Sequence, residues 1–121
     1  MTRKEALAEL IAKVEAGGLI QPFLFQDLFN NQDAHENCAG EAYGAYKGSL
    51  DAAKALHEAA LPGWWWWTCI SADTAPDYEV ILTRHDEFGE TVSEAHGYSG
   101  NPARAWLLAI LRALHSMEPS E

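Results

Sequence analysis

Apolar residues recur at helical spacing in three stretches of this chain. The first stretch begins at Thr2, which has the spacing of a capping box with Glu5, and it stops at Gly17. The second follows Ser49, a residue type favoured at the N-cap, and continues to about Ala60. Each stretch has apolar positions along one side, as a helix packed on a core requires. The pattern therefore predicts a helix at each place.

The third helical stretch has the strongest start signal of the three. Asn101 suits the N-cap, Pro102 suits the first helical position, and a broad apolar face follows as far as Ser116. Between the first two helices, residues 20–29 are too apolar and aromatic to form a solvated loop, and Pro22 is suited to opening a turn or two of helix. We therefore expect a short fourth helix in this segment.

Three strand candidates lie between the second and third helical stretches. They span residues 64–71, 78–85 and 90–98, and short runs of turn-forming residues separate them. Links this short favour antiparallel neighbours, so the strands are expected to form a meander. Residues 30–48 have the composition of a long irregular loop, and 117–121 that of a frayed acidic tail.

These elements predict an α+β fold in a single domain spanning residues 1–121. A three-stranded antiparallel meander is sandwiched between helices, in the order helix, short helix, helix, three strands, helix. A chain of 121 residues, 48% of them hydrophobic, is long enough to bury one core and too short for two cores of typical size.

Four consecutive tryptophans, residues 64–67, begin the first strand candidate. Successive strand residues point to opposite faces of a sheet, so each face receives two of them. A tryptophan can bury roughly 150–250 Å², so a pair left in water would expose a patch on the order of 400 Å². Three covers are available: helices on both sides of the sheet, a partner protein, or a ligand with a flat face.

The charge of the chain limits the classes of partner that it can bind, and its lack of targeting segments indicates its compartment. Eight basic and eighteen acidic residues leave a net charge of −10, which repels phosphate backbones and anionic lipids, so neither direct nucleic-acid binding nor membrane binding is expected. No signal sequence or apolar run of membrane-spanning length is recognised, which predicts a cytoplasmic protein. Cys38 and Cys69 are then expected to be reduced thiols.

Three segments of the chain resemble the phage ABA-sandwich domain family, small proteins of phages and prophages. They read SLDAAKAL at 49–56, LPGW at 61–64 and PARAWLLAILRAL at 102–114. The resemblance implies a sheet between helical layers and a viral protein acting in the host cytoplasm, and it assigns Trp64 and Trp66 to the core. The family brings no established activity, so it implies no reaction.

No pattern in the sequence indicates catalysis. There is no nucleophile–base–acid arrangement, no phosphate-binding glycine loop and no paired-carboxylate motif, so neither an enzyme nor a cofactor is expected. His35 and Cys38 lack the second half of a zinc site, so no metal is expected. The polar residues 85–87 are typical of a solvated turn. His57 and His115 are interpreted as surface or helix-end histidines.

The second tryptophan pair suggests a site for a nucleotide-derived ligand. Tryptophans would stack on a base, and arginine, a helix N-terminus and hydrogen-bond donors would hold a phosphate. The candidate ligand-binding residues are Trp65, Trp67, Arg84, His96, Tyr98 and Arg104. The alternative for Arg84 is that it pairs with one of the many surface carboxylates.

Three functions remain open at this point. The first hypothesis is a phage counter-defence protein that sequesters a small nucleotide signal of host immunity. The second is an acidic inhibitor that imitates nucleic acid and occupies the basic groove of a host nuclease or CRISPR effector. The third is a small virion structural or assembly protein. The apolar surplus also makes a homo-oligomer plausible.

Overall fold

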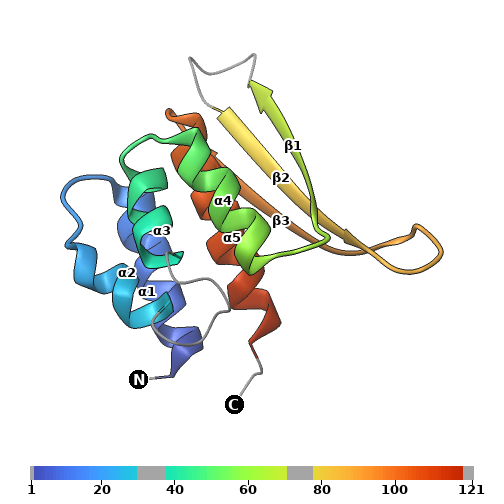
Figure 1. Cartoon of the computed structure of the whole chain (residues 1–121), viewed down its shortest axis with the longest axis horizontal. Helices are drawn as coiled ribbons and strands as arrows, with labels where there is room; N and C mark the ends of the chain where they lie inside the picture. Colours follow the sequence, from blue (N-terminus) through green and yellow to red (C-terminus); the bar gives the residue numbers. More distant parts are fainter. Residues whose placement is uncertain (1, 30–37, 71–77, 119–121) are drawn as a thin grey trace.

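The computed structural model describes residues 2–29, 38–70 and 78–118, which form five helices and a three-stranded antiparallel sheet (Figure 1). The α+β class, the meander and the flanking helices are confirmed. In chain order the elements are α1 (Arg3–Ala16), α2 (Pro22–Phe29), α3 (Cys38–Tyr46), α4 (Leu50–Ala60), β1 (Trp65–Ile70), β2 (Tyr78–His85), β3 (Thr91–Ser99) and α5 (Pro102–Met117).

Helices α1, α4 and α5 begin where their capping residues predict. Thr2 and Glu5 form both hydrogen bonds of a capping box at the start of α1. The Ser49 hydroxyl accepts from the backbone N–H of Ala52, and the Asn101 side chain accepts from the backbone N–H of Arg104. Each bond satisfies an N–H group that the first turn of a helix leaves without a partner.

The sheet has the strand order β1-β2-β3, and both strand pairs are antiparallel. Helix α5 lies across β2 and β3, over a face that includes Val80, Leu82 and Ala95, all of which are buried. The helix and β3 lie very close together at Gly97, where an added Cβ would lie 2.0 Å from the carbonyl oxygen of Ala105. The core therefore forms between this sheet face and α5.

The other helices pack on α5 and on one another. Helices α1, α3 and α4 contact α5, and α2 contacts α3, so the helices gather on one side of the sheet (Figure 1). Helix α5 is the central element of the fold, because it touches both the sheet and this helical layer. Its buried residues are Ala103, Ala105, Trp106, Leu107, Leu108, Ala109, Ile110, Leu111, Ala113 and Leu114.

The expectation of an irregular loop over residues 30–48 is wrong for residues 38–46, which form α3. The Asn, Gln, Gly and Asp content of residues 30–48 suggested a loop, but Ala42, Ala45 and Tyr46 are buried. The small surface of Gly44 lets α3 approach α4 closely, since a Cβ there would lie 3.0 Å from that of Ala52. Tertiary packing thus overrides weak helix propensity. Residues 30–37 lie outside the described residues.

The structure describes two residues of the predicted frayed tail, Met117 and Glu118. Helix α5 extends through Met117, and Glu118 forms a 2.9 Å ion pair with Arg3 at the start of α1. Residues 119–121 of the expected tail lie outside the described residues. Over the part of the chain that the structure describes, none of the helices has the length and apolar character needed to cross a bilayer.

Candidate binding surface on the sheet

The sheet has a second face, opposite α5, on which three rows of cross-strand neighbours lie side by side. Trp65 pairs with Thr83, Trp67 with Ile81, and Cys69 with Glu79. Directly paired residues project from the same face, and the register with β3 extends each row by one residue. We call this the open face; it comprises Trp65, Trp67, Cys69, Glu79, Ile81, Thr83, Glu94, His96 and Tyr98.

Aromatic side chains on the open face are exposed. Trp65 retains 61% of its accessible surface, Trp67 53% and Tyr98 56%. The interpretation that helices cover both tryptophan pairs is therefore wrong for the described residues. The reason is that α1, α3 and α4 pack on α5 instead of crossing to the other side of the sheet. An exposed aromatic group of this size is typical of a binding surface.

Charged groups lie at the β3 side of the open face. The Nδ1 atom of His96 lies 2.8 Å from a carboxylate oxygen of Glu79, and its Nε2 atom lies 2.5 Å from one of Glu94. The hydrogen bond to Glu79 is the main reason that the pKa of His96 is raised and that of Glu79 is lowered. One imidazole thus stands between two carboxylates, and the group carries net negative charge even when the imidazole is protonated.

Tyr98 completes this charged group. Its ring stacks against that of His96, with centroids 6.4 Å apart and an angle of 16° between the planes. A hydrogen bond to Glu79 raises the pKa of the Tyr98 hydroxyl. The aromatic and acidic parts of the open face are therefore one continuous surface.

Two polar atoms near Trp65 lack hydrogen-bond partners among the residues that the structure describes. They are the hydroxyl oxygen of Thr83 and the Nδ1 atom of His85, and both are buried. Thr83 is the cross-strand partner of Trp65, and the His85 ring lies 5.1 Å from the Trp65 ring. Buried polar groups are normally satisfied. These two atoms therefore give the Trp65 end of the open face unused hydrogen-bonding capacity.

The structure brings four of the six predicted ligand-binding residues together: Trp65, Trp67, His96 and Tyr98 share the open face. Arg84 lies on the other face, because it follows Thr83 in β2 and successive strand residues alternate. It pairs with Ser93, to whose hydroxyl it donates at 3.3 Å. Its guanidinium group also lies 6.0 Å from the Trp64 ring. The predicted alternative, pairing with a carboxylate, is not what the described residues show.

Arg104 is also away from the open face. It donates to the backbone carbonyl of Tyr46 from Nε and Nη2, at 3.1 and 2.9 Å. Its guanidinium group stacks on the Tyr46 ring at 4.1 Å. This arginine therefore connects the start of α5 to the end of α3, and neither predicted arginine reaches the aromatic platform.

The first and third tryptophans of the run lie on the helix side of the sheet. Their expected place in the core is confirmed for Trp64, which is buried, and is wrong for Trp66, which keeps 42% of its surface exposed although its ring contacts those of His57 and Trp106. The interpretation of His57 as a surface or helix-end residue is wrong, since it is 2% exposed. The apolar positions Ala53 and Ala60, four residues before and three after His57, are the signal that was available for its burial.

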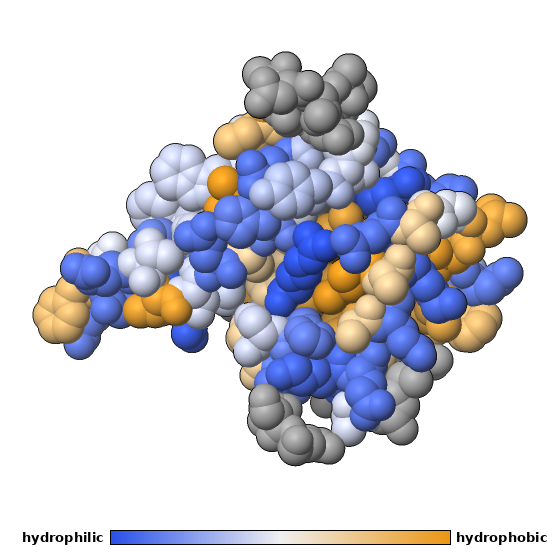
Figure 2. Space-filling view, turned by 180° about the vertical axis from the view of Figure 1, so that it is seen from behind, coloured by the Kyte–Doolittle hydropathy of each residue, from blue (hydrophilic) through white to orange (hydrophobic). Residues whose placement is uncertain are grey.

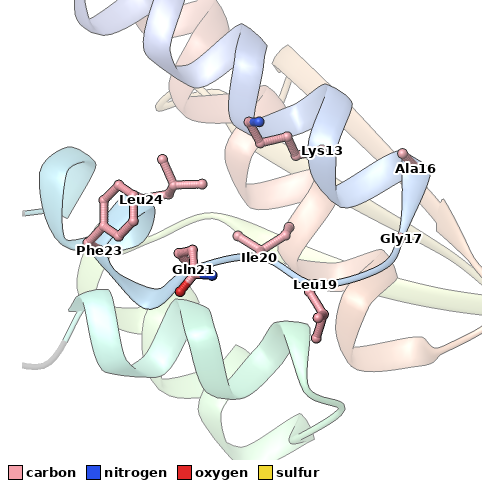
Figure 3. A pocket seen from close by; sticks show the side chains of 8 residues that line it. All are labelled: Lys13, Ala16, Gly17, Leu19, Ile20, Gln21, Phe23 and Leu24. Carbon is pink, nitrogen blue, oxygen red and sulfur yellow. The ribbon is translucent and has the colours of Figure 1, made fainter.

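The surface of the molecule also has two hollows, which are lined mainly by apolar side chains. A cavity of about 370 Å³ lies between the end of α1 and the start of α2, with Lys13 on one wall and Phe23 and Leu24 on another (Figure 3). A hollow of about 230 Å³ is lined by Trp64, Trp65 and Trp66. Within the described residues, no group of three or more His, Cys, Asp or Glu side chains could hold a metal ion.

The hairpin that joins β2 and β3 is a further exposed hydrophobic feature. It projects from the body of the protein, and hydrophobic residues lie at its end (Figure 2). Phe88 and Val92 are 81% and 49% exposed. The Asp86 carboxylate accepts from the backbone N–H groups of Phe88 and Glu90, which holds the turn in one conformation.

Comparison of the chain with protein-family models, with curated proteins and with solved structures gave no match. The resemblance to the phage ABA-sandwich domain family therefore stays a prediction based on the three segments named above.

Proposed function

We propose that this chain is a non-enzymatic binding protein whose open face holds a basic surface of a partner protein. The observation that carries the proposal is the combination on one sheet face of exposed Trp65 and Trp67 with the carboxylates of Glu79 and Glu94. Tryptophan faces attract arginine and lysine side chains, and carboxylates pair with the same cations. The three-stranded scaffold holds both kinds of group in a fixed arrangement.

Charge supports a basic partner over an anionic ligand. The chain has a net charge of −10, so it attracts a basic protein surface before contact and repels a phosphate. Arg84 and Arg104, the residues expected to hold a phosphate, point elsewhere. On the open face itself His96 is the one basic side chain, and two carboxylates already engage it.

Of the three starting hypotheses, the acidic protein-directed inhibitor agrees best with this chemistry. An acidic surface that carries aromatic groups is suited to the basic groove of a nucleic-acid-binding enzyme such as a host nuclease or CRISPR effector. The nucleotide-sequestering hypothesis is still supported by the exposed tryptophans, but the two arginines expected to bind the phosphate do not lie on the open face. Phage origin and a role in the virion stay predictions.

A titration with two defined ligands tests the proposal. The probes are an octa-arginine peptide and a cyclic dinucleotide, each added at low salt to isotopically labelled protein whose indole N–H signals are followed by nuclear magnetic resonance. We expect the peptide to shift the Trp65 and Trp67 signals most, with an affinity that falls steeply as salt rises. Trp67→Ala should weaken peptide binding by about 3- to 30-fold, the worth of one cation–π contact.

A matched control separates a specific surface from general acidity. Glu94→Gln and Glu9→Gln remove the same charge, but Glu9 is an exposed residue of α1 outside the open face. Peptide binding should weaken more for Glu94→Gln. Equal losses would show that only net charge matters and would overturn the proposal. Saturable shifts with the dinucleotide and none with the peptide would favour the nucleotide hypothesis.

A further inference from the structure

Strand β1 is an edge strand that, as far as the described residues show, lacks the usual protection against pairing with another chain. Its six residues, Trp65–Ile70, are all exposed and include no charge and no proline. Exposed edge strands normally carry such residues, because their free N–H and C=O groups can bind another strand. Within the described residues, no hydrogen bond from outside the β1–β2 ladder reaches the backbone of this strand.

The opposite edge of the sheet, β3, is engaged by a side chain of α5. The guanidinium group of Arg112, on α5, donates at 2.7 Å to the backbone carbonyl of His96 in β3. The same group forms a 2.6 Å ion pair with Glu15 of α1, and β3 also carries the charge of Glu94. The two edges therefore differ: Arg112 and the charge of Glu94 protect β3, and among the described residues β1 has no equivalent.

We propose that two copies of this chain pair through β1, in antiparallel orientation about a two-fold axis at Trp67, and so form one six-stranded sheet. The occupant of the free edge is a second copy because the strand is complementary to itself in this register. Trp65 stands opposite Cys69 of the partner copy, and Trp66 stands opposite its Thr68. Each large side chain except the axial Trp67 thus faces a smaller one.

Charge favours this edge for self-association over the rest of the surface. Two chains of net charge −10 repel each other, so a contact between copies is least costly where neither presents a charged residue. Strand β1 is the one strand of the described sheet without an Asp, Glu, Lys or Arg residue. Pairing would also join the two open faces into one surface, with the partner copies of Trp65 and Trp67 adjacent.

The oligomeric state of the full chain tests the proposal directly. Sedimentation equilibrium should show a dimer for the wild type, and Thr68→Lys should raise the dimer dissociation constant by about tenfold or more, because it places a charge on the edge. Thr91→Lys is the matched control, since Thr91 is an exposed threonine of β3, and it should leave the dimer unchanged. A wild type that stays monomeric at concentrations up to about 100 μM would overturn the proposal, because any dimer would then have a dissociation constant well above that concentration.

Cysteine cross-linking tests the register and does not depend on Thr68→Lys folding correctly. Residues 65 and 69 of one strand are about 13 Å apart, too far for a disulfide within the chain. Trp65→Cys, with the native Cys69 retained, should therefore form a covalent dimer on mild oxidation, and adding Cys69→Ser should abolish it. Covalent dimer from Trp67→Cys but not from Trp65→Cys would place the axis at Thr68 and overturn the register proposed here.

The outcome is independent of the proposed function. Thr68 pairs with Val80 and lies on the helix side of the sheet, so Thr68→Lys leaves the residues of the open face in place. A monomer that still binds the octa-arginine peptide would refute the dimer alone. A dimer that does not bind the peptide would refute the proposed function alone.

Discussion

The indole N–H of Trp106 donates to the Nδ1 atom of His57 across 3.3 Å. Because an indole nitrogen is only a donor, Nδ1 must accept, and the ring proton of a neutral imidazole then resides on Nε2. That atom lies 2.9 Å from the carbonyl oxygen of Trp64, to which it donates. One buried histidine thus links α4, α5 and the residue that precedes β1, and both of its nitrogens are satisfied.

We predict that His57→Ala destabilises the fold by about 2–4 kcal/mol. The substitution removes a buried ring and leaves the Trp106 N–H and the Trp64 carbonyl without partners, and both effects cost free energy. Urea unfolding monitored by circular dichroism measures the loss. His115→Ala, near the end of α5, is the control and should change the stability by no more than about 0.5 kcal/mol. Equal effects would show that neither the buried ring of His57 nor its hydrogen bonds stabilise the fold more than His115 does.

The same histidine should resist protonation. Burial lowers the pKa of His57, because its charged form is poorly solvated. In the unfolded chain it titrates near 6.5, so its contribution to stability is complete above about pH 6.5 and is lost as pH falls through the lower folded-state pKa. The imidazole signals of His57 in a pH titration should therefore still be those of the neutral ring below about pH 6.5, where a free imidazole is protonated. Protonation of His57 at or above about pH 6.5 would contradict the assignment.

His96 should behave in the opposite way. Its pKa is raised by Glu79 first and by Glu94 second, so its ion pairs stabilise the fold below about pH 6.5 and are lost as pH rises through the folded-state pKa. Glu79→Gln should lower the pKa of His96 more than Glu94→Gln does. Nuclear magnetic resonance titration of each variant measures both values, and a larger effect from Glu94→Gln would reverse the order of the two partners.

Gly97→Ala should destabilise the protein by about 1–3 kcal/mol or more, because overpacking a core usually costs this much. The new Cβ would meet backbone atoms of Ala105 and Ala109 at 2.0 and 2.5 Å, and α5 would have to move away from β3. Gly40→Ala is the matched control. It has no atom within 4 Å of an added Cβ and lies within α3, so alanine there should stabilise the fold by about 0.5–1 kcal/mol. Thermal unfolding distinguishes the two signs.

Arg104 should matter for stability and not for ligand binding. Arg104→Ala removes two hydrogen bonds to the Tyr46 carbonyl and the stacking on its ring, which should cost about 1–3 kcal/mol. Arg84→Ala, which removes one long hydrogen bond at an exposed position, should cost no more than about 0.5 kcal/mol. Denaturant unfolding compares them. Similar losses would contradict the distinct roles that the contacts assign to the two arginines.

Local signals predicted most of the secondary structure. Capping residues placed the starts of α1, α4 and α5, and the strand pattern matched β2 over residues 78–85. These features depend on neighbours within a few positions, where hydrogen bonding and side-chain periodicity act directly. Helix α3 was missed because its sequence is a poor helix former alone, and it is stabilised by burial against α2 and α4.

The sequence by itself also determined that two of the four tryptophans would point to each side of the sheet, because the period of a strand is two. What lies over each side depends on contacts between distant segments, so only the tertiary structure decided it. Helices α1, α3 and α4 pack on α5, which leaves Trp65 and Trp67 exposed beside Glu79 and Glu94. The same strand alternation places Arg84 on the helix side, and packing of α5 on α3 engages Arg104 with Tyr46. The sequence thus predicted that Trp65 and Trp67 share a face, and the fold determined that Glu79 and Glu94 lie beside them.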